Sequence, residues 1–293
     1  MNFSLPSFAK INWSLRVLGK RSDGYHELCT VFQTVSLCDR IEIEESPTLS
    51  LTCSDTRIPI TSENLILKAA EMLRAAAGID RGARIHLDKR IPSPGGLGGG
   101  SSNAAVALIG LSRLWNIDST EILPRIGAEL GADVPFFLYG GTAIGTGRGD
   151  VIEAIADIPA GPMLIVTPDI AIPTADIFAR YRAATLTEWP QNHTLSVCRA
   201  EAEMLQPAAS ELVNDLEGIV LEAFPEVARV KMALLEHGAV NAVLCGSGAS
   251  VLGVFDKQET RQTAENALDS ESTWRKFAVS AVSRSLYREE LGL

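Results

Sequence analysis

The chain lacks any long hydrophobic run. Although 46% of its 293 residues are hydrophobic, no window of about eighteen consecutive apolar residues occurs, and the sequence therefore predicts no membrane-spanning helix. Residues 1–10 contain no basic stretch followed by an apolar core, so no signal peptide is expected. We expect a cytoplasmic protein without a membrane partner, long enough for one large domain or two moderate ones.

Basic residues are scarce relative to acidic ones. The chain has 26 Lys and Arg against 36 Asp and Glu, which gives a formal net charge of −10. Broad nucleic-acid binding depends on neutralising phosphates with basic side chains, so this balance argues against a nucleic-acid partner. A nucleotide substrate is still compatible with it, because a local pocket lined by N–H groups can bind phosphate.

Patterns of metal-binding or disulfide-forming residues are also absent. None of the five cysteines forms a Cys-x-x-Cys pair, and the four histidines show no metal-ligand spacing, so we predict no protein metal site. The odd number and wide spacing of the cysteines are typical of reduced thiols in a cytosolic enzyme. The cysteines are Cys29, Cys38, Cys53, Cys198 and Cys245.

Glycine, in contrast, is concentrated in one segment. Five of the twelve residues from Pro92 to Asn103 are glycine. The segment follows residues 83–91, whose alternation predicts a strand, and it precedes a helical pattern that begins at Ala104. Glycine lets the backbone approach an anion, and a helix N-terminus offers unpaired N–H groups and a favourable dipole. A flexible linker is the alternative, but a strand–loop–helix unit favours a loop that binds the phosphates of a nucleoside triphosphate.

The glycine segment does not match the commonest phosphate loops. A Walker A loop requires a lysine that this run lacks, and the dinucleotide fingerprint requires glycine where Ser101 stands. The V-A-I-K and H-R-D signatures of protein kinases are absent as well. A different phosphate-transfer architecture is therefore expected.

Hydrophobic patterning predicts an α+β chain, strand-rich in its first third and mixed afterwards, with a soft boundary near residue 158. The turn over 19–24 has a Ser-Asp-Gly tip. Strands are predicted at 9–18, 30–37, 39–45, 83–91 and 161–168, with two more over 242–255. Helices are predicted at 64–77, from 104, at 120–130 with Thr120 as its cap, and at 174–184, 200–205, 216–224 and 225–237, before a last helix and strand.

Two charged residues and one short segment stand out chemically. Asp133 precedes the apolar run 134–137; it is interpreted either as the cap of a short helix or as a base that takes a proton from an acceptor hydroxyl. Lys10 lies on the polar face of its strand and is either solvated or directed at the glycine loop, where it would neutralise charge or hold the base and the acceptor hydroxyl. Residues 246–249 form either a tight turn or a further source of N–H groups for a nucleotide.

Taken in order, these segments resemble the GHMP kinase superfamily, which includes galactokinase and the homoserine, mevalonate and phosphomevalonate kinases. The hallmark loop P-x-x-x-G-L-G-[SG]-[SG]-[SG] is matched within Pro92–Ser102. Residues 9–12 (Ala-Lys-Ile-Asn) and 21–26 (Arg-Ser-Asp-Gly-Tyr-His) are similar to the kinases of 4-diphosphocytidyl-2-C-methyl-D-erythritol. The second element is the specific one, because the glycine loop identifies only the superfamily. Further agreement occurs at 131–136, 140–143, 173–178 and 214–217.

The resemblance implies a two-lobed GHMP kinase fold. Residues 1–158 would form an N-terminal ribosomal-protein-S5-like, ATP-binding lobe with a left-handed βαβ unit, and residues 159–293 a C-terminal ferredoxin-like lobe. ATP and acceptor would meet in the cleft between them. The implied reaction uses ATP and Mg²⁺ to phosphorylate the 2-hydroxyl of 4-diphosphocytidyl-2-C-methyl-D-erythritol, in the non-mevalonate route to isoprenoid precursors.

The resemblance also implies residue roles. Asp133 would be the general base and Lys10 its electrostatic partner. The glycine loop would bind the ATP phosphates. Its implied ATP-binding residues are Pro92, Ser93, Pro94, Gly95, Gly96, Leu97, Gly98, Gly99, Gly100, Ser101 and Ser102.

For the acceptor, Tyr25 and Phe178 would sandwich the cytosine ring by stacking. His26 would hydrogen-bond the pyrimidine edge, and Asn12 and Thr174 would contact the substrate. Packing at the exit of a hairpin is the alternative interpretation of Tyr25 and His26.

Three positions depart from the family pattern. Phe8 replaces the proline expected before Ala9, and Pro94 lacks an N–H, which removes one potential phosphate donor. Asn103 stands where Asp is frequent, so no Mg²⁺-ligand role is assigned to it. The alternatives are another GHMP kinase with a different acceptor, or a non-catalytic nucleotide-binding regulator; the retained Lys10, Asp133 and complete loop argue against the regulator.

Overall fold

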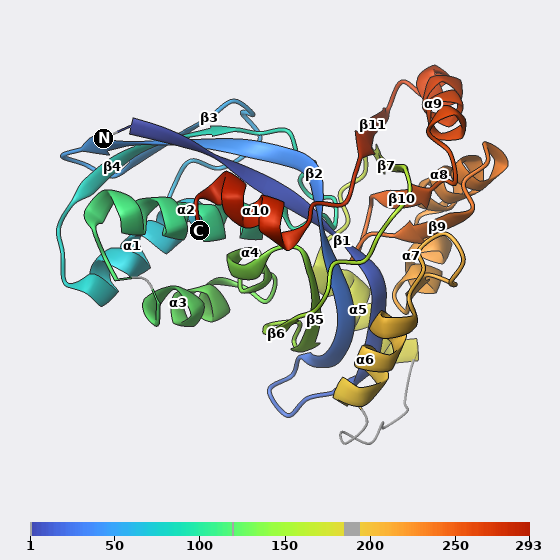
Figure 1. The fold of residues 1–293 in the computed structure, drawn as a ribbon, viewed down its shortest axis with the longest axis horizontal. Coiled ribbons are helices and arrows are strands. Elements are labelled where there is room, and N and C mark those ends of the chain that lie inside the picture. Colours follow the sequence, from blue (N-terminus) through green and yellow to red (C-terminus); the bar gives the residue numbers. More distant parts are fainter. Residues whose placement is uncertain (1, 119, 185–193) are drawn as a thin grey trace.

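The computed structural model describes residues 2–118, 120–184 and 194–293. The chain forms two lobes of mixed α and β structure, which confirms the predicted class (Figure 1). No helix in these ranges is both long and apolar enough to cross a bilayer.

A long antiparallel hairpin organises the N-terminal lobe. Strands β1 (Asn2–Lys20) and β2 (His26–Ser46) pair along most of their lengths and run diagonally through Figure 1. The prediction of two separate strands at 30–37 and 39–45 was wrong, because Cys38 pairs opposite Phe8 and the change of register there is absorbed within a continuous β2. The sheet order is β3-β4-β2-β1-β8, and β5 pairs with β2 and β6. The added strands are β3 (Ser50–Cys53), β4 (Gly82–Asp88), β5 (Thr142–Gly147), β6 (Val151–Ala154) and β8 (Val213–Asn214).

Helices cover one face of this sheet. Helix α2 is nearly all buried and packs against β1, β2 and the neighbouring helices, since Gly110 leaves room for the Ile43 side chain. Its apolar neighbours form one continuous core that includes Tyr287 and Leu291 from the far end of the chain. The helices are α1 (Leu65–Ala77), α2 (Gly99–Trp115), α3 (Ile122–Leu130), α4 (Phe136–Tyr139) and α10 (Arg284–Leu291).

The C-terminal lobe is a four-stranded antiparallel sheet in the order β11-β7-β10-β9. Helices separate β7 from β9 and β10 from β11, so the chain runs through a βαββαβ arrangement, the ferredoxin-like topology. Helix α8 packs on this sheet. The elements are β7 (Met163–Pro168), α5 (Thr174–Ala184), α6 (Thr194–Met204), α7 (Glu217–Ala223), α8 (Pro225–Glu236), β9 (Asn241–Leu244), β10 (Val251–Val254), α9 (Gln258–Ala267), a 3₁₀ turn (Leu268–Ser270) and β11 (Trp274–Val279).

Four local predictions were wrong. Helix α2 begins at Gly99 rather than at Ala104, so the last part of the glycine segment is already helical. Thr120 does not cap α3, because its N–H and hydroxyl both bond to Asp118. Helix α6 begins at Thr194, not at residue 200, and α10 follows the last strand.

The cysteines differ partly from expectation. Cys29 is disulfide-bonded, contrary to the prediction of reduced thiols throughout. Cys38, Cys53 and Cys245 are free thiols, as expected.

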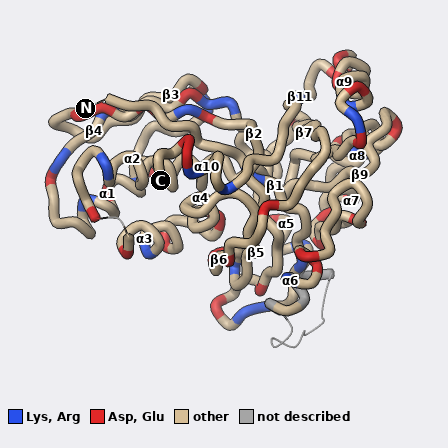
Figure 2. Tube along the Cα trace, viewed as in Figure 1, with Lys and Arg blue, Asp and Glu red and all other residues tan. Residues whose placement is uncertain are grey.

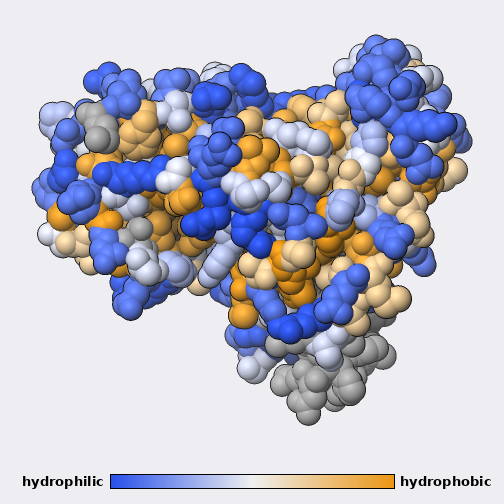
Figure 3. All heavy atoms as spheres, in the orientation of Figure 1, coloured by the Kyte–Doolittle hydropathy of each residue, from blue (hydrophilic) through white to orange (hydrophobic). Residues whose placement is uncertain are grey.

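Charged residues of both signs are interspersed along both lobes (Figure 2). Figure 3 shows hydrophobic side chains gathering where the two lobes meet, and one groove there is lined by Ile144 and Ile155 on the sheet side and Leu205 after α6. Because charges of both signs are mixed along the chain, the charges that line a given cavity, rather than the net charge, decide which anions that cavity can bind.

Candidate active site

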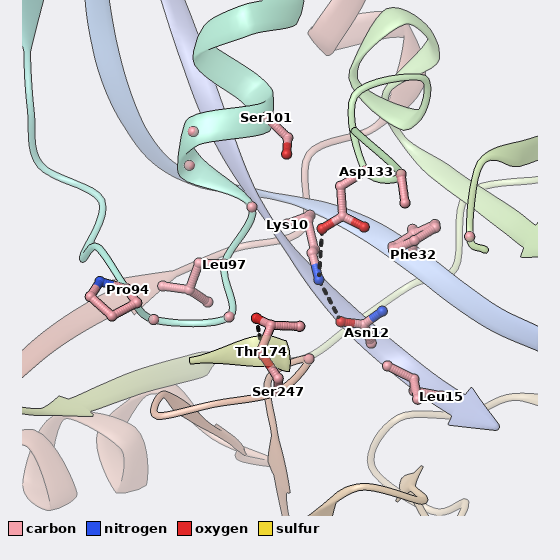
Figure 4. Close-up of a pocket in the computed structure, with 18 of the residues that line it drawn as sticks. Lys10, Asn12, Leu15, Phe32, Pro94, Leu97, Ser101, Asp133, Thr174 and Ser247 are labelled. Carbon is pink, nitrogen blue, oxygen red and sulfur yellow. Dashed lines mark hydrogen bonds and ion pairs between the residues drawn. The ribbon is translucent and has the colours of Figure 1, made fainter. Parts of the chain in front are cut away.

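A cavity of about 410 Å³ lies between the lobes. Its walls come from β1 and β2, the glycine segment, the turn after β9, the start of α5 and residues 148–149. In Figure 4, Lys10 lies between Asp133 and Asn12, with the glycine segment on one side and Thr174 and Ser247 on another. The structure thus brings most of the predicted site residues to one place.

The glycine segment is held tightly against its surroundings. Gly96 has a φ of +73°, and a Cβ added to it would lie 1.9 Å from the carbonyl oxygen of Cys245. Gly98 has a φ of +68° and precedes α2, whose first intrahelical bond runs from the Ser102 N–H to the Gly98 oxygen at 2.8 Å. The N–H groups of the first turn of α2 have no partner within the helix, and the positive end of the helix dipole lies there. Both favour an anion in the cavity. Of the predicted loop residues, Pro92 to Ser101 line the cavity, whereas Ser102 is buried beneath it.

Lys10 is buried rather than solvated. Its ammonium donates to Asn12 Oδ1 at 2.8 Å and lies 3.5 Å from Asp133 Oδ2. The same group lies 5.5 Å from the centre of the Phe32 ring. The Lys10 backbone N–H donates to the Leu97 oxygen at 3.0 Å, which joins β1 to the glycine segment. Because its side chain is 4% exposed, the ion pair with Asp133 operates under weak solvent screening.

Asp133 faces the cavity with a side chain that is 33% exposed. It does not cap α4, since no side chain makes a cap hydrogen bond to that helix. Asp133 is the single carboxylate among the described residues that line the cavity, and Lys10 and Arg148 are the cations there. The walls therefore carry a small positive excess, which suits phosphate-bearing ligands.

The remaining predicted residues lie on the side of the cavity away from α2. Asn12 Nδ2 donates to Thr30 Oγ1 at 2.8 Å, which leaves the Asn12 side chain fixed beside Lys10. The hydroxyls of Thr174 and Ser247 lie 2.8 Å apart and join the start of α5 to the turn after β9. Phe178 lines the cavity with them.

Tyr25 and His26 lie next to the cavity rather than among its lining residues. The His26 ring stacks on Phe178, with 5.2 Å between ring centroids and 28° between planes. Tyr25 is 57% exposed, and the Arg148 guanidinium lies 5.1 Å from its ring centre. In this structure the ring stacked on Phe178 is therefore His26, and Tyr25 pairs with Arg148.

Arg21 and Asp23, which precede Tyr25 and His26 in the sequence, make the contacts that order the hairpin tip. Asp23 accepts from Arg21 Nε at 3.0 Å and from the Tyr25 N–H at 3.1 Å. Glu27 accepts from Arg21 Nη1 at 2.7 Å and from the Gly147 N–H at 3.0 Å, and its hydrogen bond raises the pKa of Arg21. These contacts hold the tip against the turn that carries Arg148.

Arg148 and Phe32 are among the lining residues that the sequence interpretation missed. Arg148 lies in the second glycine-rich stretch, 140–150, and a lone cation among turn glycines was the available signal. Phe32 gave no such signal in the sequence, because an aromatic residue on a strand usually belongs to the hydrophobic core. Gly246 and Ser247 line the cavity, in line with the nucleotide-site interpretation of that segment.

Within the described residues, no group of three or more His, Cys, Asp or Glu side chains could hold a metal ion by itself. The cavity does present oxygen donors, among them the Ser101 hydroxyl and the Asp133 carboxylate. Mg²⁺ in phosphoryl-transfer sites is commonly held by one or two protein oxygens together with substrate phosphates. This donor set fits a cation that arrives with a nucleotide.

Comparison with known proteins identifies the family. Residues 64–141 match the model described as GHMP kinases N terminal domain, and residues 199–272 match GHMP kinases C terminal. Relatives named 4-diphosphocytidyl-2-C-methyl-D-erythritol kinase include those of Moorella thermoacetica and Solibacter usitatus. The first is 40% identical, covering 90% of this chain and 94% of the relative, and the second is 39% identical, covering 97% and 90%.

Solved structures agree with this assignment. A crystal structure of 4-(cytidine 5'-diphospho)-2C-methyl-D-erythritol kinase has a TM-score of 0.77 and 33% identity, covering 95% of this chain and 99% of that one. The mevalonate kinase of Methanococcus jannaschii, at 16% identity and a TM-score of 0.69 with 97% and 98% coverage, shares the fold. The sequence similarity along almost the whole chain, together with this fold, shows that the chain belongs to the 4-diphosphocytidyl-2-C-methyl-D-erythritol kinase family of the GHMP kinases.

Proposed function

We propose that this chain is an ATP-dependent kinase that phosphorylates the 2-hydroxyl of 4-diphosphocytidyl-2-C-methyl-D-erythritol, giving the 2-phosphate and ADP. It would act in the cytoplasm, in the methylerythritol phosphate route to isoprenoid precursors. The observation that carries the proposal is the Lys10–Asp133 pair, 3.5 Å apart, in a cavity shared with a glycine-rich helix start.

Asp133 is proposed to act as the general base. One carboxylate oxygen accepts the proton of the acceptor 2-hydroxyl as that oxygen forms its bond to the γ-phosphorus of ATP. The bond from the γ-phosphorus to the bridging oxygen breaks, and its electron pair leaves with ADP. Lys10 keeps Asp133 oriented toward the acceptor, because its other contact, to Asn12, fixes the ammonium from the opposite side.

Residues Pro92 to Ser102 of the glycine segment are proposed to hold the ATP phosphates. Free N–H groups in the first turn of α2 supply hydrogen bonds without a side chain that would block a close approach. Phosphoryl transfer depends mainly on positioning and on neutralising charge, and this arrangement provides both. Pro94 has no backbone N–H, so the N–H groups that bind phosphate are those of the later residues of the segment, next to α2.

Bound together with ATP, Mg²⁺ would supply charge neutralisation at the phosphates. Ser101 and Asp133 are the side chains that would hold it, together with phosphate oxygens. The remaining charge is met by Lys10 and Arg148, the cations of the cavity walls.

The acceptor is proposed to bind on the side of Thr174, Phe178 and Asn12. The cytosine ring would stack on Phe178, with Tyr25 as the second aromatic face and His26 at its hydrogen-bonding edge. The His26 ring stacks on one face of Phe178 in this structure, so the cytosine would use the other face of Phe178 or replace the His26 ring there.

The two lobes are proposed to divide near residue 158, with residues 1–158 binding ATP and 159–293 contributing to the acceptor side. Helix α10 and strand β8 are exceptions within the second part, because α10 packs into the N-terminal core and β8 pairs with β1.

The test is ADP release with Mg-ATP, comparing 4-diphosphocytidyl-2-C-methyl-D-erythritol with homoserine, mevalonate and galactose. Release with the cytidylated acceptor alone is expected. Release with another acceptor would overturn the acceptor assignment, and ATP binding without release from any acceptor would favour a non-catalytic regulator.

The base role is tested with Asp133→Asn, for which we expect kcat to fall about 10²- to 10⁴-fold while ATP still binds. Glu129→Gln is the matched control, because it removes an exposed carboxylate nearby that does not line the cavity. Near-normal turnover by Asp133→Asn with an intact fold would remove the base from the mechanism.

A further inference from the structure

A second acid–base pair lies beneath the glycine segment, outside the cavity. Asp39 is fully buried on β2, and Lys89 Nζ donates to its Oδ2 at 2.6 Å. Neither residue lines the cavity. A buried carboxylate is costly unless charge and hydrogen bonds satisfy it, and Asp39 accepts four hydrogen bonds.

The four donors come from both ends of the glycine segment. At its entrance, the N–H groups of Arg90 and Ile91 donate to Asp39 Oδ1 at 2.7 and 2.8 Å. At its far end, Asn103 Nδ2 on α2 donates to Asp39 Oδ2 at 2.9 Å, beside Lys89. One rigid side chain on a central strand thus joins residues 90–91 to residue 103, and the glycine segment spans the distance between them.

Further contacts make this connection stiff. Asn103 Nδ2 also donates to Ser7 Oγ at 2.8 Å, and Ser7 shares a 2.8 Å hydrogen bond with Ser102, the residue before Asn103. Lys89 Nζ donates to the Ile91 oxygen at 2.7 Å. Burial lowers the pKa of Lys89, an effect that the adjacent Asp39 opposes.

We propose that Asp39 is a positioning residue for ATP binding: by tying the entrance of the glycine segment to α2, it fixes the spacing at which the loop N–H groups meet the phosphates. The inference rests on the proposed binding of ATP phosphates by the glycine segment, but not on the identity of the acceptor. Glycines cannot supply this rigidity themselves, because they restrict the backbone least of all residues.

The test is Asp39→Asn, which is nearly isosteric and keeps an oxygen for the Arg90 and Ile91 N–H groups. Its amide nitrogen would face the ammonium of Lys89 and the amide nitrogen of Asn103, so three donors would meet with no acceptor between them. We expect the Kd for Mg-ATP, measured by calorimetry without acceptor, to rise at least about tenfold, while the KM for the acceptor changes less than about twofold. Asn103→Ala, which removes the bond from α2 to Asp39 and the bond to Ser7 but leaves the Lys89, Arg90 and Ile91 donors in place, should raise the ATP Kd in the same direction and by less.

Trp115→Phe is the control for general loss of stability. It removes the 3.3 Å bond from the indole to the Gly82 oxygen, at the end of α2 opposite the glycine segment. It should lower the unfolding midpoint without changing the ATP Kd. The proposal is overturned if Asp39→Asn binds ATP within twofold of the parent chain, or if it weakens ATP and acceptor equally. If the parent chain itself does not bind ATP, the proposed function fails rather than the role of Asp39.

Discussion

The contact between Gly96 and the turn after β9 allows a sharp test of how the glycine segment is built. A Cβ at this position would overlap the Cys245 oxygen at 1.9 Å and approach its carbonyl carbon at 2.9 Å. Both are backbone atoms, so no rotamer change relieves the overlap. The φ of +73° adds a conformational cost of about 1–2 kcal/mol for a residue with a Cβ. Relief of the overlap adds about 1–3 kcal/mol, as in other overpacked sites.

We therefore expect Gly96→Ala to lower the free energy of unfolding by about 2–5 kcal/mol, the sum of these two ranges. It should also weaken ATP binding, because the glycine segment would have to move away from the C-terminal lobe. Denaturant unfolding and calorimetry with Mg-ATP measure the two effects.

Gly100→Ala is the matched control from the same segment. Gly100 lies in the first turn of α2, and the nearest atom to an added Cβ is Leu65 Cδ1 at 3.8 Å, an ordinary contact. Its substitution should leave the fold stable or stabilise it by about 0.5–1 kcal/mol, as expected for alanine replacing glycine in a helix. Equal destabilisation by the two variants, or wild-type stability and ATP affinity in Gly96→Ala, would refute the reasoning.

Two further predictions concern the acceptor side and pH. Glu27→Gln should raise the KM for the cytidylated acceptor about three- to tenfold and leave the KM for ATP unchanged. The reason is that it weakens a charge-assisted hydrogen bond from Arg21, worth about 1 kcal/mol, which holds the hairpin tip. Steady-state kinetics with each substrate varied measure both constants, and a rise of both KM values together would contradict the prediction. Burial raises the pKa of the Cys245 thiol from 9.0 to about 12. Between these values the unfolded chain releases a proton that the folded chain keeps, so the free energy of unfolding falls as pH rises, by up to about 1.4 kcal/mol per pH unit from this group. Cys245→Ala should flatten that fall in urea unfolding between pH 9 and 11, and identical slopes in the two proteins would show that the thiol does not titrate in this way.

Predictions based on local pattern were the most reliable. The helix Thr174–Ala184 was predicted with its observed bounds, and the helix predicted at 64–77 begins one residue later because Asn64 caps it. The ordered motifs placed Lys10, Asp133 and the glycine segment together before any contact was known. Such features depend on residues close in sequence or on a family pattern.

The misses depend on distant contacts. Helix α10 carries few apolar residues, and it is fixed by Tyr287 and Leu291, which enter a core formed by the other end of the chain. The Tyr287 hydroxyl also donates to the Phe137 oxygen, a partner 150 positions away. Asp39 gave no signal for the same reason, because its four donors come from segments about fifty or more positions later.

Helix α10 also has a consequence for biosynthesis. As the chain leaves the ribosome, β1 to β6 appear first, but Val282, Tyr287 and Leu291 reach the N-terminal core only after the entire second lobe has been made. Gly140, whose absent side chain makes room for the Tyr287 ring, would meanwhile border an unfilled space. The first lobe to be translated is therefore the last to be completed, and the second lobe must fold as an insertion between two parts of the first.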